Sequence, residues 1–415
     1  MNDLNDFLYE ELLNLPFNLF EIISEYIAIN KNEKVAFVGG YLRDLLIWQI
    51  HKGKKLKPID LDIVVEGSAI NLAIFIKKNI KNVELCLIKE FNLYKTVEVN
   101  INDLKVDIAS ARKEIYPSPG FNPIIKDSNI LNDLKRRDFT INTIAFEISD
   151  KELIDIHNGL NHIYTKKLHL LHNESIKDDP SRILRCAKYS SRLGFKLDKN
   201  SLKQAQNFIL KWPWDVSEED NKRKIPPGIS IRLRMELSEI IKHDNLSKII
   251  KILHEWQVLS IINKDITLNA KFLRGLHWVK RLKGKIILYL TKDSKSLESI
   301  GERLFLNTKD LKIIRDYFLI KNKLINKEEE FLNFSPSNWT EFIEGKNLDP
   351  ETVKLIICDG GKFWRNFLRW LITYRYIKSD KNGKILKEEG WKPGKEMGDE
   401  LKRLRFRQID NLRKH

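Results

Sequence analysis

The spacing of apolar residues changes twice along the chain. Residues 4–29 place Leu, Phe and Ile on a helical stripe that is interrupted near Pro16, which predicts one or two short amphipathic helices. From 34 to about 150, strand-like apolar runs alternate with helical spacing and predict mixed α/β structure. Beyond 175, apolar residues recur at steps of three and four almost to the end, so this part is predicted to be helical.

Two stretches interrupt these patterns. The segment from Ile115 to Asn132 is rich in proline and is expected to be an irregular loop, and the charged segment from Trp212 to Gly228 is expected to be a surface loop. In the mixed region the candidate strands are 35–38, 60–65, 83–88, 93–101, 104–109, 143–148 and 152–156, and the candidate helices are 41–50 and 68–79.

The charge of the chain favours a polyanionic partner. The 415 residues carry a formal net charge of +16, which fits either nucleic acid or an anionic membrane. Residues 361–415 hold 16 Lys or Arg against 7 Asp or Glu, so a basic face is expected there. Aromatic residues interleave with that charge at helical spacing, and most of them are expected to be core: Phe363, Trp364, Trp370, Tyr374 and Tyr376.

The cysteines and the N-terminus indicate the compartment. Cys86, Cys186 and Cys358 lie far apart without metal-ligand spacing, so neither a disulfide framework nor a zinc site is expected. This pattern indicates a protein of the reducing cytosol. No Lys or Arg precedes Lys31, which excludes an ordinary secretory or mitochondrial presequence. Because no apolar run reaches membrane-spanning length, we expect a soluble cytoplasmic chain.

Asp60 and Asp62 stand two residues apart on a predicted strand. Alternate residues of a strand face the same way, so the two carboxylates can hold divalent cations together. Upstream, the Gly39-Gly40 turn joins a strand to a helix, and such a turn can bind an anion. A solvated strand face and an ordinary turn are the alternatives for each motif taken alone; their order and spacing favour a metal and phosphate site.

A third motif, Arg136-Arg137-Asp138, supplies cations. The adjacent guanidinium groups offer bidentate donors to phosphate or ribose oxygens, and Asp138 can orient one of them. Downstream lies a fourth motif, Asp178-Asp179-Pro-Ser-Arg182-Ile-Leu-Arg185-Cys-Ala-Lys188.

Together these motifs closely resemble the class II tRNA nucleotidyltransferase and bacterial poly(A) polymerase family, whose members build or repair the CCA end of tRNA. The resemblance runs from about Val35 to Leu197 and weakens afterwards. It rests on Gly39-Gly40-Tyr-Leu-Arg43-Asp44, Asp60-Leu-Asp62, Arg136-Arg137-Asp138, Asp155-Ile-His-Asn-Gly159, Asp179-Pro-Ser-Arg182 and Arg232 to Glu236.

The resemblance implies an α+β fold class. A small mixed-sheet, palm-like nucleotidyltransferase head would be followed by all-helical neck, body and tail domains. The expected domains are 1–150 for the N-terminal helices and head, 151–245 for a neck that recognises the base, 246–335 for the body and 336–415 for a basic tail that binds tRNA.

The resemblance also implies the chemistry. Asp60 and Asp62 would hold two Mg²⁺ ions and promote attack of an RNA 3′-hydroxyl on a nucleoside triphosphate, with pyrophosphate released. Asp107, on a neighbouring strand, is either a third carboxylate near the metals or simply the partner of Arg112. The residues implied to contact triphosphate or ribose, or in the case of Arg43 to close the site, are Gly39, Gly40, Arg43, Arg136, Arg137 and Asp138.

Choice of nucleotide is implied for Asp179 and Arg182, which are expected three residues apart on one helix face. Cytosine and adenine present an amino donor beside a ring-nitrogen acceptor, which suits a carboxylate next to a guanidinium; uracil and guanine present the reverse order. The pair would therefore accept CTP and ATP and reject the others. Arg185 and Lys188 continue the pattern as nucleotide or RNA contacts. Lys188 stands where the family has arginine and would lie about 180° from Asp179, so it could reach only a phosphate.

The same motifs serve CCA addition, CC-only addition, A-only addition and polyadenylation. Residues 86–95 lack the Gly-Arg-Arg-Phe-like run associated with poly(A) polymerases, which disfavours polyadenylation. A non-catalytic RNA-binding protein would not require the two acids. We expect CCA addition with the tRNA acceptor arm, CTP and ATP as partners and no obligatory protein partner, and CC-only and A-only addition stay open. The chain departs from the family in a longer basic connection at Ile47 to Lys57 and in Ile231, where an acidic residue is usual.

Overall fold

The structure is a computed structural model, and it describes residues 2–53, 55, 57–117, 121–211 and 227–412. Contacts within the chain define two units. The first comprises residues 1–212 and 226–236, and the second comprises 213–225 and 237–415. This division lies near the boundary expected at 245, whereas the finer boundaries at 150 and 335 stay predictions.

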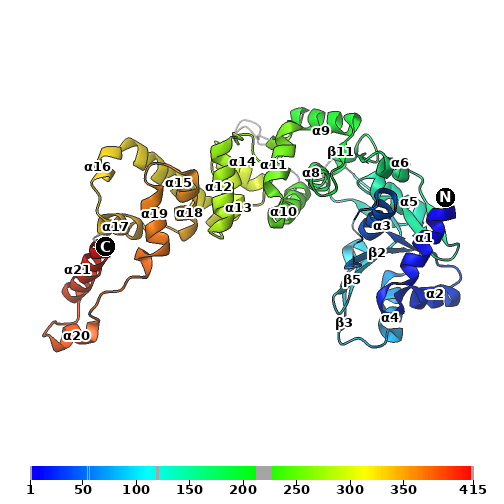
Figure 1. Cartoon of the computed structure of the whole chain (residues 1–415), viewed down its shortest axis with the longest axis horizontal. Coiled ribbons are helices and arrows are strands. Elements are labelled where there is room, and N and C mark those ends of the chain that lie inside the picture. Colours follow the sequence, from blue (N-terminus) through cyan, green and yellow to red (C-terminus); the bar gives the residue numbers. More distant parts are fainter. Residues whose placement is uncertain (1, 54, 56, 118–120, 212–226, 413–415) are drawn as a thin grey trace. The chain divides into compact units, whose positions relative to one another are not determined.

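A seven-stranded mixed sheet forms the centre of the first unit, in the order β3-β4-β5-β2-β1-β8-β9 (Figure 1). Every neighbouring pair is antiparallel except β2 and β5, which run parallel. The strands of this sheet are β1 Val35–Val38, β2 Asp60–Val65, β3 Cys86–Phe91, β4 Thr96–Ile101, β5 Leu104–Ser110, β8 Ala145–Glu147 and β9 Glu152–Ile154. Two smaller sheets pair β6 Arg112–Ile115 with β7 Ile124–Asp127, and β10 Lys167–Leu168 with β11 Lys196–Leu197.

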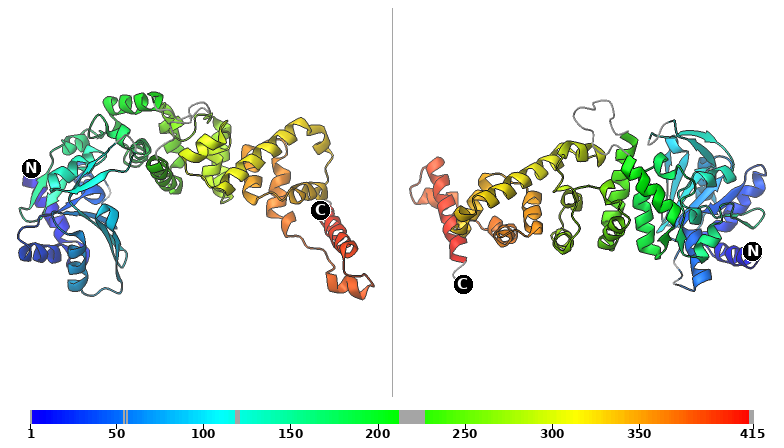
Figure 2. Two further views of the ribbon diagram at one scale, coloured as in Figure 1. Left: turned by 180° about the vertical axis from the view of Figure 1, so that it is seen from behind. Right: turned by 90° about the horizontal axis from the view of Figure 1, so that it is seen from above.

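Helices cover the sheet of the first unit (Figures 1 and 2). Helix α4 packs on β3, β4 and β5 and also on α2, while α3 packs on β1, β2 and β8. The helices that lie in this unit are α1 Asn2–Leu13, α2 Leu19–Ile29, α3 Gly39–His51, α4 Ala69–Asn79, α5 Ile130–Lys135, α6 Gly159–Tyr164, α7 Ser175–Asp178, α8 Arg182–Leu193 and α9 Lys199–Lys211; α10 Pro227–Lys242 crosses the division between the units.

The alternation of strand β2 explains how the acids become accessible. Leu61 and Ile63 are fully buried, whereas Asp60 is exposed and Asp62 is half-buried on the opposite face. Burial of the apolar side chains fixes the register of the strand, because a slip of one residue would move the acids into the core. The hydrophobic pattern therefore holds the two carboxylates on one open face of the sheet.

The second unit is helical, as the apolar spacing predicts. Helix α18 packs on α12, α15 and α19, and α17 packs on α19 and α21. Rings of Phe331, Trp339, Phe363 and Phe367 meet within this unit. Its helices are α11 Leu246–Glu255, α12 Ala270–Arg281, α13 Ile286–Thr291, α14 Leu297–Arg303, α15 Thr308–Asn326, α16 Glu328–Leu332, α17 Pro336–Gly345, α18 Pro350–Asp359, α19 Trp364–Ile372, α20 Gly383–Glu388 and α21 Lys395–Asn411.

Most predicted elements are confirmed. The break near Pro16 separates α1 from α2, and strands 35–38 and 60–65 have the predicted bounds. The strand predicted at 83–88 lies instead at 86–91. The loop predicted at 115–132 is wrong in part, because residues 124–127 pair with 112–115 as a hairpin and α5 begins at Ile130. Proline breaks regular structure only locally, and the residues on either side of the break still pair, from Arg112 with Asp127 to Ile115 with Ile124.

Other expectations have mixed outcomes. Helix α3 takes up the first part of the connection at 47–57, and Lys55 forms an ion pair with Glu11 at 2.5 Å. The loop predicted at 212–228 lies largely outside the described residues. The three cysteines are free thiols, as expected.

The tail aromatics and the membrane test complete the picture. Phe363, Trp370 and Tyr374 are buried as predicted, but Tyr376 is exposed. In the described part of the chain, no single helix has the length and apolar character to cross a membrane. The bent pair Asp3–Leu13 and Pro16–Ile29 meets that criterion only when its two arms, which differ in direction by 94°, are taken together.

Candidate active site

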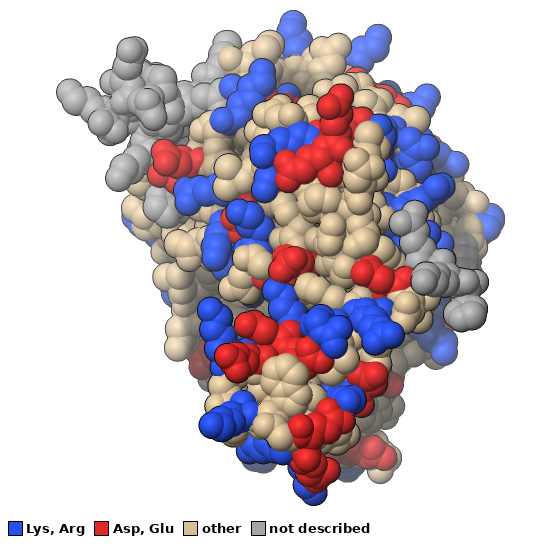
Figure 3. Space-filling model, turned by 90° about the vertical axis from the view of Figure 1, so that its left-hand side faces the viewer, with Lys and Arg blue, Asp and Glu red and all other residues tan. Residues whose placement is uncertain are grey.

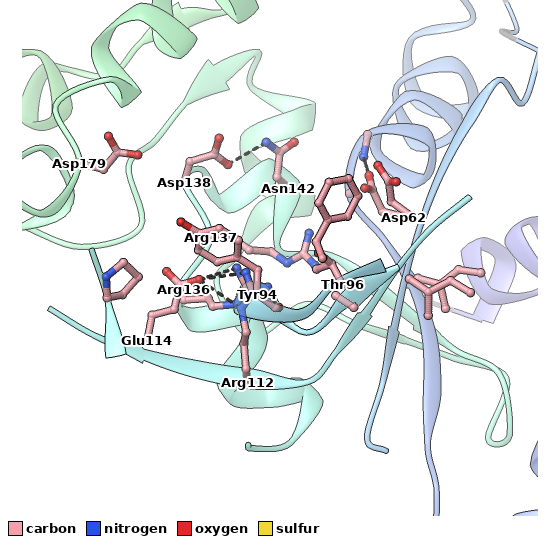
Figure 4. A pocket seen from close by; sticks show the side chains of 18 of the residues that line it. Asp62, Tyr94, Thr96, Arg112, Glu114, Arg136, Arg137, Asp138, Asn142 and Asp179 are labelled. Carbon is pink, nitrogen blue, oxygen red and sulfur yellow. Dashed lines mark hydrogen bonds and ion pairs between the residues drawn. The ribbon is translucent and has the colours of Figure 1, made fainter. Parts of the chain in front are cut away.

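A cavity of about 710 Å³ lies in the first unit and gathers most of the predicted site residues. Figure 4 shows Asp62 near one side of it and Asp179 near the other, with Asp138 and Asn142 between them. The cavity is lined by residues from strands β2, β4, β5 and β6, the start of helix α3, the segment after α5, and helices α8 and α10. Its charged and polar lining residues include Asp62, Glu98, Lys105, Asp107, Arg112, Glu114, Tyr116, Arg136, Arg137, Asp138, Asn142, Asp179, Arg182, Arg185, Tyr189 and Arg232.

The two glycines at the start of α3 fit closely around Asp62. Gly39 has φ +77°, and a side-chain carbon there would lie 2.1 Å from Asp62 Oδ2. Only glycine can combine that backbone conformation with such a close approach. The Gly40 N–H then donates to Asp62 Oδ2 at 3.1 Å. The sequence indicates this turn as an anion site, and the anion that it contacts in the structure is the carboxylate of Asp62.

Strand pairing brings Asp107 beside the predicted acids. In the parallel ladder, Asp62 is the partner of Asp107 and Asp60 is the partner of Lys105. Asp107 does not pair with Arg112, so that alternative is wrong: its Oδ2 accepts from Lys105 Nζ at 2.6 Å. Arg112 instead contacts Glu114 on its own strand. The face therefore presents Asp107 beside Asp60 and Asp62, although no group of three or more Asp, Glu, His or Cys in the described residues is placed to hold a metal ion by itself.

Burial and neighbouring charges shift the pKa values of two of these acids. Burial, opposed by the nearby Lys105 ammonium and reinforced by the charges of Asp62 and Asp107, raises the pKa of Asp60 above its usual range. Burial also raises the pKa of Asp107, against the effect of Lys105. A carboxylate whose pKa is raised gains from a nearby cation. The chemistry of this donor set, oxygen ligands only, suits a hard divalent cation such as Mg²⁺.

The arginine doublet is oriented by an acid that the sequence analysis did not single out. Arg136 donates to Asp133 Oδ1 through Nε at 2.9 Å, and Arg137 donates to Asp133 Oδ2 at 3.2 Å. Asp133 is fully buried beneath them. The expectation that Asp138 orients one of this pair is wrong. Both arginines line the cavity, and Arg137 Nε is buried there with no hydrogen-bond partner among the described residues.

Asp138 belongs to a different network, which Figure 4 shows in part. It accepts from Asn142 Nδ2 at 2.9 Å and from Arg185 at 3.1 Å. Asn142 in turn accepts from Arg43 at 2.7 Å, and Arg185 donates to Asp179 at 2.9 Å. A continuous chain of hydrogen bonds therefore runs from Arg43 on helix α3 to Asp179 in the segment before α8.

Arg43 is an internal member of this chain. Its side chain is 1% exposed, forms an ion pair with Asp44 at 2.8 Å and lies over the Tyr189 ring. It does not line the cavity, so the triphosphate contact expected from the sequence has no support in its position. The helical phase explains this placement, because Arg43 is one turn past Gly39 and faces the interior of the unit.

Asp179 and Arg182 both face the cavity, but they do not lie on one helix. Asp179 follows α7 in an extended conformation, with φ −143° and ψ 93°, and Arg182 is the first residue of α8. The expected helical spacing is therefore wrong, and the turn formed by Pro180 and Ser181 brings the two residues together instead. The residue before a proline is disfavoured in the helical conformation, which explains why Asp179 is extended and why α7 and α8 are separate helices.

Asp179 is buried and remains ionised. Burial alone would raise its pKa, but the guanidinium groups of Arg185, Arg232 and Arg182 hold the pKa below its usual range. Its Oδ1 accepts from Ser181 N and Oγ at 3.1 and 2.6 Å, and Oδ2 accepts from Arg185 at 2.9 Å. Since a carboxylate oxygen has two acceptor positions, Oδ2 retains capacity for one further donor.

Arg182 has the complementary property. It is 4% exposed, and its Nη2 donates to the carbonyl of Arg136 at 3.2 Å. Its Nε and Nη1 are buried with no hydrogen-bond partner among the described residues. An unsatisfied buried donor costs about 1–3 kcal/mol, and such groups in a native structure commonly await a ligand. The cavity thus presents unused donors from Arg182 near an unused acceptor of Asp179.

Arg185 and Lys188, which were predicted to contact nucleotide or RNA, form ion pairs with acids of the chain. Arg185 lines the cavity but bridges Asp138 and Asp179 and approaches Glu236 at 3.4 Å. Lys188 also contacts Glu236 at 3.4 Å and does not line the cavity. The angle predicted between Lys188 and Asp179 does not apply, because Asp179 does not lie on α8. Arg185 and Lys188 both hold α8 in place.

Sequence reasoning missed several lining residues. Lys105 and Glu98 alternate with buried apolar residues on β5 and β4, a pattern that would have placed them on the face of the acids. Tyr116, whose hydroxyl donates to Glu114 at 3.1 Å, has no comparable indication in the sequence. It reaches the cavity only because the β6–β7 hairpin forms.

The basic tail is more balanced than its composition suggests. Lys402 pairs with Glu341 at 2.7 Å, and Arg405 pairs with Glu344 at 2.7 Å. On the face that Figure 3 presents, Lys and Arg alternate with Asp and Glu. The exposed lysines of this region include Lys384, Lys387 and Lys392.

The sequence of the chain is similar to those of known nucleotidyltransferases. Residues 35–169 match the family model described as the poly A polymerase head domain. The A-adding tRNA nucleotidyltransferase of Aquifex aeolicus is 29% identical over 90% of this chain and 44% of its own length. That of Halalkalibacterium halodurans is 30% identical over 62% of this chain and 57% of its own length. The chain thus spans about half, or less, of the length of these relatives.

Solved structures give the same picture at the level of the fold. A CCA-adding enzyme in an apo form is similar with a TM-score of 0.74 and 25% identity, covering 97% of this chain and 94% of that one. The Thermotoga maritima CCA-adding enzyme complexed with tRNA gives a TM-score of 0.67 at 24% identity, covering 95% and 91%. The head followed by helical segments is shared along nearly the whole chain.

Proposed function

We propose that the chain is a tRNA nucleotidyltransferase that adds C, A or both to the 3′ end of tRNA, since residues 35–169 match the poly A polymerase head domain and A-adding tRNA nucleotidyltransferases are among the relatives. CTP and ATP would be the nucleotide substrates and pyrophosphate the leaving group. One observation carries the proposal: a single cavity has strand carboxylates at one side and, at the other, a buried carboxylate and guanidinium with unused hydrogen-bonding capacity.

The strand acids are proposed to join the nucleotide to the RNA. Asp60 and Asp62 would hold two Mg²⁺ ions, with Asp107 as a third carboxylate beside them. When bound, the ions would lower the pKa of the RNA 3′-hydroxyl and neutralise the triphosphate. The donation from Gly40 N–H keeps the Asp62 carboxylate in one orientation. Since the chain supplies so few ligands, oxygens of the triphosphate and water would complete the coordination.

The arginines beside the acids are proposed to hold the triphosphate. Arg136 and Arg137 are fixed by Asp133, so their remaining donors keep a constant direction into the cavity. Arg112 lines the same wall. Fixed guanidinium donors match phosphate oxygens well. A triphosphate bound here would extend from the glycine turn toward Asp179.

Asp179 and Arg182 are proposed to select the base. The free acceptor position on Asp179 Oδ2 suits the amino group of cytosine or adenine, and the unpaired donors of Arg182 suit the adjacent ring nitrogen. Uracil and guanine would set acceptor against carboxylate and N–H against guanidinium. That mismatch leaves buried groups unpaired and lowers the rate for the wrong base.

A-only addition is the second candidate. It is favoured by relatives whose names are A-adding tRNA nucleotidyltransferase, including one that matches 90% of this chain. A CC-adding relative, that of Deinococcus radiodurans, matches 39% of the chain at 32% identity. The pair Asp179 and Arg182 suits both bases equally, so it does not separate these activities.

The test supplies three tRNA substrates that end at the discriminator base, at C or at CC, each with Mg²⁺ and one labelled nucleotide. Full CCA addition predicts C on the first two substrates and A on the third. A-only addition predicts label from ATP on the CC substrate alone. Absence of incorporation from every nucleotide on every substrate would contradict the enzymatic proposal, and long A tails on unrelated RNA would select a polymerase.

A further inference from the structure

The carboxylates at the open end of the cavity already surround a cation that belongs to the chain. Lys105 Nζ lies 2.6 Å from Asp107 Oδ2, 3.4 Å from Glu98 Oε2 and 3.9 Å from Asp60 Oδ1. These three acids come from three adjacent strands, β5, β4 and β2. The ammonium group is the only contact that these acids share in the described part of the chain.

The register of the sheet places these side chains beside one another. Lys105 is paired directly with Asp60 on β2, and Asp107 is paired with Asp62 on β2 and with Glu98 on β4. All five side chains therefore point from the same face of the sheet. Four carboxylates at such spacing repel one another, and one ammonium among them reduces that repulsion.

Lys105 is suited to leave this position. Its side chain is 37% exposed and ends a flexible stem, so it can move without disturbing the core. Glu98 lies on β4, the strand farther from Asp60, and it is held by a donation from Asn100 at 2.9 Å. An ammonium displaced from Asp60 and Asp107 therefore still has an acidic partner on the side away from β2.

We propose that Lys105 occupies the cation position when no nucleotide is bound and competes there with divalent metal ions. This rests on the proposed function, since it takes Asp60 and Asp62 as the metal ligands. The competition makes the chain alone a weak binder of Mg²⁺ or Mn²⁺. A bound triphosphate supplies further oxygen ligands, so metal and nucleotide bind together and Lys105 gives way. Lys105 is thus a positioning residue that couples metal loading to the nucleotide.

The experiment measures Mn²⁺ binding to the full chain without nucleotide, by the electron paramagnetic resonance signal of free Mn²⁺. Lys105→Gln removes the competing charge and should tighten binding on the order of tenfold at low salt. Lys105→Arg keeps a cation at this place and should bind as weakly as the wild type. Lys113→Gln, on an exposed position of β6, is the matched control and should not change binding. Circular dichroism verifies that each variant is folded.

The outcomes separate this inference from the proposed function. If the wild type binds Mn²⁺ and Lys105→Gln binds it no more tightly, the competition is refuted while the metal site stands. If Asp62→Asn binds Mn²⁺ as the wild type does, the metal site of the proposed function is refuted instead. Tighter binding by Lys105→Gln that is lost again on adding Asp62→Asn supports both.

A second measurement uses the unmodified chain and does not depend on the folding of a variant. Acylation of lysines by an activated ester, followed by mass spectrometry, reports how accessible each amine is. Mg²⁺ together with a non-reacting CTP analogue should increase modification of Lys105 several-fold relative to Lys113. Unchanged modification of Lys105 under conditions that saturate the nucleotide site would overturn the displacement.

Discussion

The two ends of the cavity solve opposite electrostatic problems. Beside the strand end, Asp60 does not line the cavity and is 64% exposed, and Lys105 lies among the acids. At the helix end, the Asp179 side chain is 8% exposed and is held by Arg185, Arg232 and Ser181. The first region has too few cations for its carboxylates, whereas the second places three arginines, Arg182, Arg185 and Arg232, around one buried carboxylate.

This difference matches the proposed division of labour. A region that exchanges metal ions and releases pyrophosphate benefits from ligands that are accessible and incompletely neutralised. A region that recognises a base edge must keep its donors and acceptors fixed, because discrimination depends on the cost of an unmade hydrogen bond. Hydrogen bonds of Asp138 with Asn142 and Arg185 lie between the two regions, which keep their different electrostatic properties.

The strand end should be essential for rate and nearly irrelevant to tRNA binding. Asp62→Asn keeps the shape of the side chain but removes a proposed metal ligand, and we expect turnover to fall about 10³-fold or more. Binding of tRNA, measured by filter retention or fluorescence anisotropy, should change less than about twofold. The exposed Asp103, in the turn between β4 and β5, offers the control Asp103→Asn. Substantial turnover by the Asp62 variant would remove the strand end from the reaction.

The helix end should dominate stability. Arg185→Met leaves Asp138 and Asp179 buried without their shared partner, and the free energy of unfolding is expected to fall by about 3–5 kcal/mol. Arg192→Met removes an ion pair of the same helix at a position that is 41% exposed, so it should cost less than about 1 kcal/mol. Urea denaturation of both variants makes the comparison. Equal losses would show that burial of the network does not matter.

Acid should weaken the helix end in a defined direction. Burial raises the pKa values of Asp138 and Asp179, but Arg185 and its neighbours lower them by more. Both pKa values therefore lie below the usual range in the folded chain. A lowered folded pKa contributes stability that is present above the unfolded value of about 3.9 and is lost as the pH falls through the folded value. The urea concentration at which half of the wild type is unfolded should therefore decrease when the pH is lowered below about 4. Arg185→Met, without the cation, should show a smaller drop.

Substitutions in the second unit should alter neither rate nor selectivity. Replacing the exposed Lys384, Lys387 and Lys392 by Gln is expected to weaken tRNA binding by roughly three- to tenfold and to reduce its salt dependence. Turnover at saturating tRNA should stay at the wild-type value. Salt titrations of binding test this, and an unaltered salt slope would show that these lysines do not contact RNA.

The strand end could be predicted from sequence because its information is local. A run of β-branched and aliphatic residues fixes the strand, and a period of two places Asp60 and Asp62 on one face. Even the glycine turn was evident, although its first partner is Asp62 and not a phosphate. What sequence could not supply was the neighbour strand: the parallel pairing that places Lys105 against Asp60 joins residues far apart in the chain.

The helix end was found by motif, but its geometry was not. Asp179 and Arg182 meet through a turn before α8 rather than along a helix face, because Pro180 disfavours the helical conformation for Asp179, the residue before it. Asp138 was assigned to its adjacent arginines, yet its partner Arg185 lies 47 positions away. Buried ion pairs depend on tertiary packing, so adjacency in sequence is a poor guide to them.

The central claim is that the strand acids join the nucleotide while Arg182 and Asp179 choose it. Arg182→Gln tests it most directly. Among the described residues, the Arg182 side chain makes one hydrogen bond, to the carbonyl of Arg136, and the loss of that bond should leave the fold intact. Rates of incorporation of CTP, ATP, UTP and GTP are measured with matched tRNA ends, with Arg192→Gln as the control. We predict that preference for CTP and ATP over UTP and GTP falls about 10- to 100-fold. Loss of all four rates by one common factor, with selectivity unchanged, would contradict the account.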